Sequence, residues 1–229
     1  MIASETKSGR IHNAAGAREA ILDAAEAVFA EHGFDGARME AIARSSSYNS
    51  SLIFHYFGDK LNLYAEVIRR ADREMTVLQT QVFTPLFENE TILSNPQAFR
   101  AFLENISALY LDYLLNHPRF TRMLLWEQAE GWQTFSKIFT RFDTDNGEQI
   151  ESIFRKAYRK GMLRSNFFPI LQLSLILQIC LSFIAFIPLY QIGVTSGGDA
   201  FSPAALDDAK KYLVSFVVHG MMADPTPQP

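Results

Sequence analysis

Residues 37–60 have the sequence ARMEAIARSSSYNSSLIFHYFGDK, and this stretch decides how the chain is organised. Its serine-rich segment, 45–51, is only seven residues long and has strongly apolar helical sequence on both sides. A tight turn therefore fits this segment better than a linker does. Asn49 is a natural N-cap for a following short helix, which Gly58 ends. The pattern predicts two short helices joined by a turn.

Helical periodicity continues through the rest of the chain. Apolar residues at helical spacing predict a first helix over 18–32, a fourth over 60–78 and a long one over 133–160. No segment alternates convincingly with period two, the pattern of a half-buried strand. We therefore predict an all-α fold of about nine helices, with an N-terminal three-helix head and a larger helical domain. The expected divisions are a flexible arm at 1–15, the head at 16–60, the larger domain at 61–224 and a disordered tail at 225–229.

Composition excludes several classes of protein. Apolar residues make up 48% and charged residues 20% of the chain, which is typical of a globular protein and not of a disordered or collagen-like one. The net charge is −4, so any contact with nucleic acid must use a local surface. The single cysteine, Cys180, excludes an intramolecular disulfide and a Cys-based zinc site, and fits a reducing compartment. The motifs of phosphate-binding and dinucleotide-binding enzymes are missing, so we expect no enzyme, metal or cofactor.

A charge-free segment spans residues 165–198, and Ile170 to Ile187 is long enough to cross a bilayer. Gln172 and Gln178 interrupt it, and glutamines at mid-membrane depth need hydrogen-bond partners that lipid does not supply. We favour a helix buried in a protein assembly over a membrane anchor.

The two short helices have the arrangement of a helix-turn-helix, in which the second helix enters the DNA major groove. Residues 38–45 form the expected supporting helix, and 49–57 the expected recognition helix. Small polar side chains on the recognition helix allow close approach to base edges and phosphates. The pattern alone is weak, because many helical proteins contain a short helix pair.

The residues themselves go further. AREAILDAAEAVFAEHGFDGARMEAIA, residues 17–43, and SLIFHYFGDKLNLYAEVI, residues 51–68, resemble the N-terminal domain of the TetR/AcrR family of transcriptional regulators. The resemblance implies a cytoplasmic DNA-binding regulator, with Tyr56 and Lys60 on DNA phosphates. The expected DNA-binding residues are Arg38, Tyr48, Asn49, Ser50, Ser51, Leu52, His55, Tyr56 and Lys60.

Three features of this chain depart from the family pattern. Ser47-Tyr48 replaces Gly-Val in the turn, so Ser47 must tolerate a conformation, such as the left-handed one, that costs about 1 kcal/mol or more. Ala37 replaces the threonine that caps the second helix. Ser50-Ser51 stands where Lys-Gly is frequent.

Residues 1–70 carry eight Lys or Arg against nine Asp or Glu, so this region is nearly neutral. The charge balance predicts that DNA affinity depends only weakly on salt concentration.

Aromatic residues at helical spacing follow the head. Each has core packing as its ordinary role, but together they could line an apolar ligand cavity, as the family resemblance implies. The expected ligand-binding residues are Tyr110, Tyr113, His117, Met123, Trp126, Glu127, Phe142 and Phe154.

Dimerisation explains the charge-free helix, because an apolar surface of this length exposed on a monomer favours aggregation. The expected homodimer uses the helices near 169–189 and 203–222.

Together these features predict a ligand-responsive regulator that binds a palindromic double-stranded DNA operator. Repression relieved by a small apolar or aromatic effector is the family's usual output, and activation stays open. Two alternatives remain: a small-molecule-binding membrane or scaffold protein without DNA function, and a helical enzyme that uses the aromatic cavity.

Overall fold

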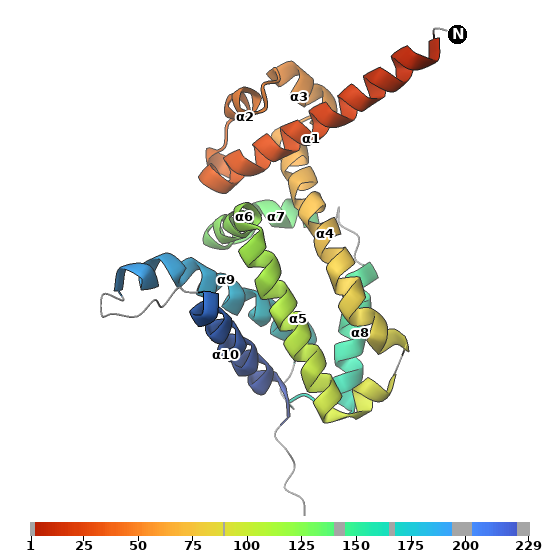
Figure 1. The fold of residues 1–229 in the computed structure, drawn as a ribbon, viewed down its shortest axis with the longest axis vertical. Coiled ribbons are helices and arrows are strands. Elements are labelled where there is room, and N and C mark those ends of the chain that lie inside the picture. Colours follow the sequence, from red (N-terminus) through yellow and green to blue (C-terminus); the bar gives the residue numbers. More distant parts are fainter. Residues whose placement is uncertain (1–2, 89, 140–144, 165–167, 194–202, 224–229) are drawn as a thin grey trace, which may run out of the picture. The chain divides into compact units, whose positions relative to one another are not determined.

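The computed structural model describes residues 3–88, 90–139, 145–164, 168–193 and 203–223 (Figure 1). Regular secondary structure in these ranges is helical, apart from one isolated antiparallel bridge between Leu163 and Met222. The predicted all-α fold is confirmed. No helix within the described ranges is both long and apolar enough to cross a bilayer.

The helices follow one another closely along the chain. Their bounds are α1 (Ala3–Gly36), α2 (Met39–Ser46), α3 (Ser50–Phe57), α4 (Lys60–Glu88), the 3-10 helix η1 (Glu90–Ser94), α5 (Pro96–Asn116), α6 (Pro118–Ala129), α7 (Gln133–Ile138), α8 (Asp145–Arg159), α9 (Pro169–Gly193) and α10 (Pro203–Met221). The described ranges hold ten α-helices where we expected about nine, because the helix expected over 133–160 is divided into α7 and α8.

The chain forms two compact units. The first contains α1, α2, α3, the beginning of α4 as far as Arg73, and also α6 and α7. The second contains the rest of α4 with η1, α5, α8, α9 and α10. This division differs from the expected boundary at residue 60, because α6 packs directly against α1 and joins the core of the first unit.

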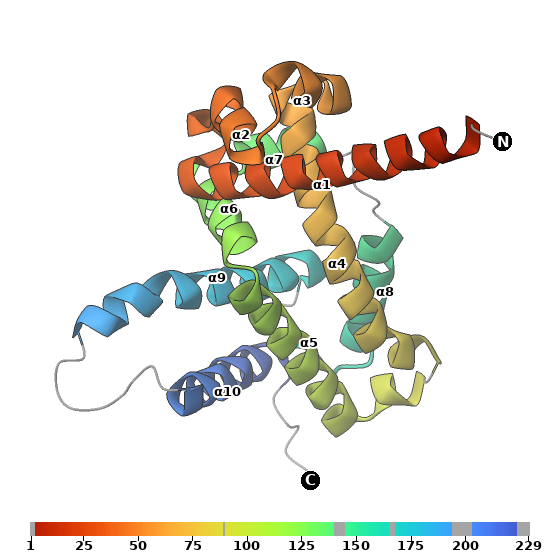
Figure 2. The same ribbon diagram turned by 45° about the horizontal axis from the view of Figure 1, so that its top comes forward.

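The core of the first unit is assembled around α1. Ile21, Leu22 and Phe29 are fully buried there, together with Ile42 of α2 and Ile53 of α3. Both views show α2 and α3 on the same side of α1 (Figures 1 and 2). Because Ile42 and Ile53 insert into one shared core, the positions of the two short helices are fixed relative to α1.

The second unit is built on α5, which packs against both α9 and α10 (Figure 2). Asn95 caps α5 by accepting hydrogen bonds from the backbone N–H groups of Gln97, at 2.9 Å, and Ala98, at 3.2 Å. The end of α10 is held by backbone hydrogen bonds from Arg164 N to Met221 O, 3.2 Å, and from Ala223 N to Met162 O, 2.9 Å. These bonds fix the segment after α8 to the end of α10.

The terminal segments differ from expectation where they are described. The first helix begins at Ala3 and not near residue 18, so the segment expected as a flexible arm is helical from its third residue. It contains no proline that could stop a helix. The expected tail at 225–229 lies outside the described residues.

Candidate nucleic-acid interface

The turn between α2 and α3 is set by Ser47. This residue has φ 61° and ψ 20°, the left-handed conformation that the sequence led us to consider, so that interpretation is confirmed. The Ser46 hydroxyl stabilises the turn by donating to Ala43 O at 3.2 Å and accepting from Tyr48 N at 3.4 Å. A left-handed non-glycine residue costs about 1 kcal/mol or more, and these local bonds help to offset that cost.

Asn49 begins α3 as its N-cap, as predicted, and its side-chain oxygen accepts a 2.8 Å hydrogen bond from Leu52 N. The cap fixes where the helix starts and therefore which residues face inward. Ile53 and Phe57 are buried in the core of the first unit. The Asn49 oxygen is already engaged in this cap, which restricts its use in reading a base.

The outward face of α3 consists of Ser51, Phe54 and His55, all of them exposed. Ser51 and His55 are among the predicted DNA-binding residues, whereas Phe54 is not and was missed. Helical spacing provides the signal that could have found it, because Phe54 lies three residues after Ser51 and so shares its face. The structure therefore adds an exposed aromatic ring to the predicted interface.

The other predicted residues of this helix and turn are half-buried. Ser50 and Leu52 flank the outward face, and Tyr48 and Tyr56 pack against the core of the first unit. The Tyr56 ring lies 6.2 Å from the ring of Phe57, edge to face, and 5.8 Å from that of His55. These contacts restrict the orientation of the Tyr56 ring, and its partial exposure leaves it available to a phosphate.

Lys60 is held inside the first unit. Its ammonium donates to Ala37 O at 2.8 Å and lies 4.6 Å from the centre of the Phe34 ring. Burial lowers the pKa of Lys60 below its usual value, and the nearby Asp35 carboxylate offsets part of this shift. The ammonium must leave these partners if it is to reach a phosphate.

Three arginines of the first unit are neutralised by nearby carboxylates. Arg18 and Arg69 both pair with Glu66, and Arg70 pairs with Asp23 at 2.6 Å and with Glu26 at 2.5 Å. The exposed cations beside the turn are Arg38 and Arg44. Arg38 also occupies the N-cap position of α2, where no side chain of the described residues makes a capping hydrogen bond. The Arg38 guanidinium and the uncapped backbone N–H groups of α2 together favour an anion.

Helix α6 supports the interface from within the same unit. The Trp126 indole donates to Ala30 O at 3.2 Å, and Met123 belongs to the buried core. Glu127 is 1% exposed, accepts a 2.7 Å hydrogen bond from the Tyr64 hydroxyl and accepts another at 3.0 Å from Phe135 N. Burial and the neighbouring Glu127 together raise the pKa of Tyr64. Met123, Trp126 and Glu127, predicted to bind ligand, thus have packing and hydrogen-bonding roles in the first unit.

The remaining predicted ligand-binding residues have different local surroundings. Phe154 is fully buried against Phe99 and Phe102, with ring centres 6.5 Å and 6.4 Å away. Tyr113 is buried and donates to Glu74 at 3.5 Å, whereas Tyr110 is half-buried on the same helix. His117 occupies the N-cap position of α6, but its side chain makes no capping hydrogen bond. Phe142 lies outside the described residues.

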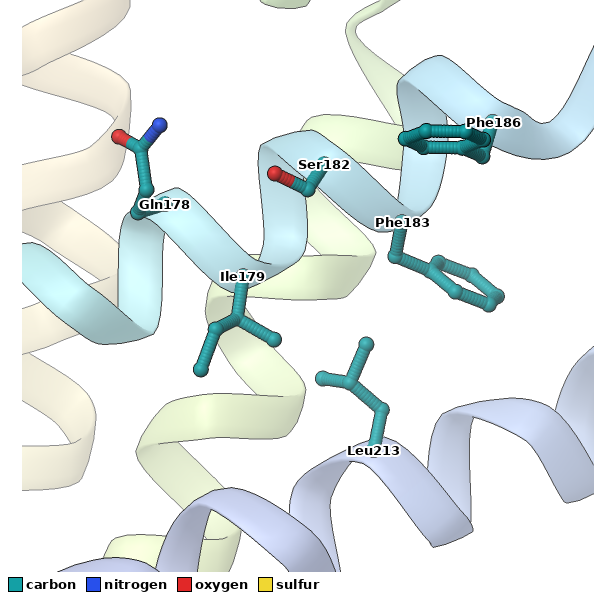
Figure 3. A pocket seen from close by; sticks show the side chains of 6 residues that line it. All are labelled: Gln178, Ile179, Ser182, Phe183, Phe186 and Leu213. Atoms are coloured by element: carbon teal, nitrogen blue, oxygen red, sulfur yellow. The ribbon is translucent and has the colours of Figure 1, made fainter.

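A pocket of about 280 Å³ lies between α9 and α10 in the second unit (Figure 3). It combines two phenylalanine rings with two polar side chains, and none of its residues was predicted to bind ligand. Its lining residues are Gln178, Ile179, Ser182, Phe183, Phe186 and Leu213. No group of three His, Cys, Asp or Glu side chains among the described residues is arranged to hold a metal ion.

Known proteins resemble this chain over the region of the interface and beyond it. The family described as "Bacterial regulatory proteins, tetR family" matches residues 21–67. The HTH-type transcriptional repressor SCO4008 of Streptomyces coelicolor is 29% identical over 196 residues, covering 83% of this chain and 90% of the repressor. The HTH-type transcriptional repressor NicS of Pseudomonas putida is 31% identical over 110 residues, covering 48% of this chain and 47% of NicS.

The fold is also similar to solved structures. The crystal structure of a transcriptional regulator of Streptomyces coelicolor, SCO4942, superimposes with a TM-score of 0.60 at 25% identity, covering 93% of this chain and 99% of that one. Two of these three proteins, SCO4008 and NicS, are named as transcriptional repressors. The match of residues 21–67 includes α2, the Ser47 turn and α3, the segment that the sequence predicts to bind DNA.

Proposed function

Because the chain belongs to the TetR family of bacterial regulatory proteins, and is thus a DNA-binding regulator of transcription, we propose that it is a repressor released by a small effector. In this proposal it binds a palindromic operator as a homodimer and leaves it when an apolar or aromatic molecule binds. The observation that carries the proposal is the outward face of α3, held by a buried opposite face and a left-handed turn.

The DNA contacts divide by their chemistry. Ser51 and His55 lie on the outward face of α3 and can hydrogen-bond base edges, whereas Arg38 and Tyr56 flank it and suit phosphates. Lys60 contributes by positioning, since its bond to Ala37 O joins the start of α4 to the segment between α1 and α2.

The homodimer is supported by the surface of the second unit. Its helices α9 and α10 expose large apolar side chains. These include Leu171, Leu175, Phe186, Leu189, Tyr212 and Phe216. Burial of an apolar surface stabilises by about 25 cal/mol per Å², so pairing these helices with a second copy is favourable. A two-fold dimer presents two recognition helices to palindromic half-sites about 34–36 Å apart, or a multiple of that distance.

The effector mechanism is a population shift between dimers that fit the operator and dimers that do not. Helix α4 contributes residues to both units, so it connects them along the chain. If the effector favours the non-binding dimer, effector and DNA weaken each other's binding by the same factor. The aromatic composition of the second unit supports an apolar effector.

Selection of bound fragments from genomic DNA by the purified full chain tests the proposal. We expect recovery of one palindromic sequence, bound by a dimer, and weaker binding by Tyr56→Phe. Tyr158→Phe, at an exposed tyrosine of the second unit, is the matched control and should bind like the unchanged protein. Recovery of random fragments, or equal binding by Tyr56→Phe, would contradict the assignment. Compounds that release the recovered DNA then identify the effector class.

A further inference from the structure

Phe54 occupies an unusual position for a phenylalanine. Its side chain is 47% exposed on the outward face of α3. Within the described residues it belongs neither to the core of the first unit nor to the side chains packed against that core. The inward contacts of α3 are made by Ile53 and Phe57, so folding of the first unit does not explain the ring.

The chemistry around Phe54 restricts what the recognition helix can read. Residues 45–57 contain no Lys or Arg, the side chains that recognise guanine by a bidentate contact. The Asn49 oxygen is engaged with Leu52 N in the helix cap, which limits bidentate recognition of adenine. The remaining groups on the outward face are the Ser51 hydroxyl, the His55 imidazole and the apolar ring of Phe54.

A phenyl ring has no hydrogen-bonding group, and the apolar feature of the major-groove floor is the C5-methyl of thymine. We propose that Phe54 determines operator specificity by packing on a thymine methyl group in each half-site, while Ser51 and His55 bind neighbouring polar groups. The inference rests on the proposed function, since it requires α3 to enter the major groove. The inference predicts that α3 recognises a thymine methyl group by an apolar contact, and not guanine or adenine through a charged or amide side chain.

Replacement of thymine by deoxyuridine removes the methyl group and leaves the base pair unchanged, so it tests the contact directly. An operator is first selected from random DNA with the full chain, and each thymine is then replaced singly. We expect one thymine per half-site at which uracil weakens binding about 3- to 10-fold, in line with the burial of one methyl group. A 5-methylcytosine at that position should bind better than cytosine.

The variant Phe54→Ala completes the test. It should bind the thymine and uracil operators equally, whereas Phe139→Ala, which truncates another exposed phenylalanine of the first unit, should keep the preference for thymine. Because Phe54 is exposed, the variant should unfold at the same temperature as the unchanged protein.

The outcomes separate this inference from the proposed function. A selected operator without a constant thymine, or one in which uracil is tolerated at every position, overturns the role of Phe54 and leaves DNA binding intact. If Phe54→Ala prefers thymine over uracil as strongly as the unchanged protein does, the role of Phe54 is also overturned and DNA binding is left intact. Failure to select any operator overturns both proposals.

Discussion

The Tyr64 hydroxyl donates a 2.7 Å hydrogen bond to the buried carboxyl group of Glu127, which joins α4 to α6 inside the first unit. The second oxygen of Glu127 accepts from Phe135 N at 3.0 Å, at the start of α7. One side chain thus connects three helices beneath the interface. Tyr64 and Glu127 are 63 residues apart in sequence, so their hydrogen bond depends on the tertiary fold.

Tyr64→Phe should lower the free energy of unfolding by about 1–2 kcal/mol, because it leaves one oxygen of a buried carboxyl group without its partner. Glu127→Gln keeps groups able to bond both Tyr64 and Phe135 N and should cost less than Glu127→Ala, which strands both donors. Urea unfolding of the three variants measures this order. Equal midpoints for Glu127→Gln and Glu127→Ala would show that the hydrogen bonds contribute nothing.

Gly33 is required at the end of α1 for two reasons. Its backbone has φ 69°, and a Cβ at this position would lie 3.2 Å from the Trp126 ring and 3.1 Å from a Glu130 oxygen. Gly33→Ala should destabilise the protein by more than the roughly 1–3 kcal/mol expected from backbone strain alone. Thermal unfolding measures the effect.

Substitutions at two other glycines separate the effect of backbone strain at Gly33 from the effect of the close contact with Trp126. Gly131 has φ 71° with no atom within 4 Å of an added Cβ, so Gly131→Ala reports strain without the contact. Gly16 lies in α1 with open space around it, and Gly16→Ala should be neutral or stabilise by about 0.5–1 kcal/mol. If Gly33→Ala and Gly131→Ala cost the same, the close approach of Trp126 has no energetic effect.

Lys60→Met separates a positioning role from a direct DNA contact. The variant keeps an apolar stem near Phe34 and loses the hydrogen bond to Ala37 O. We expect the free energy of unfolding to fall by about 1 kcal/mol and operator affinity to fall less than in Arg38→Ala. Arg38→Ala should change affinity without lowering stability, because Arg38 makes no capping hydrogen bond. A larger affinity loss in Lys60→Met would restore Lys60 as a phosphate ligand.

Operator affinity should depend weakly on salt. The structure pairs Arg18, Arg69 and Arg70 with carboxylates and leaves Arg38 and Arg44 exposed beside the turn. Two phosphate contacts per head in a dimer correspond to a slope of about −4 in a plot of log affinity against log salt concentration. Filter binding over a range of KCl concentrations measures it, and a slope near −10 is incompatible with this interface.

The Cys180 thiol should be unreactive in the folded protein. Burial raises its pKa to about 12, so the thiol stays protonated at neutral pH, and the thiolate is the reactive form. A disulfide reagent at pH 8 should label the native chain far more slowly than the chain in urea. Rapid labelling of native protein would show that the second unit opens around α9.

Local patterns in the sequence were sufficient for the existence of most helices, whereas the assignment of the interface segment also needed the resemblance to a known family. Capping at Asn49 and Asn95 and the apolar spacing of Ile42, Ile53 and Phe57 depend on neighbours a few residues away, so they are visible without a structure. The left-handed conformation of Ser47 was expected from the resemblance, because Ser47 stands where the family pattern has glycine. The helical spacing from Ser51 also predicts that Phe54 lies on the outward face of α3. An aromatic residue is, however, ordinarily assigned to a core, so the sequence analysis did not include it.

Tertiary structure alone decided which long-range partners these residues have. Helix α6 belongs to the unit that contains α1, Glu127 bonds Tyr64, and the Lys60 ammonium lies on Ala37 O instead of facing outward. Each contact joins residues that are distant in sequence, and its geometry depends on how several helices pack at once. The sequence by itself therefore determined most of the helices and the candidate interface segment, because these depend on near neighbours and on residue identity, while packing decided which polar groups of that segment are exposed and which are held by internal partners.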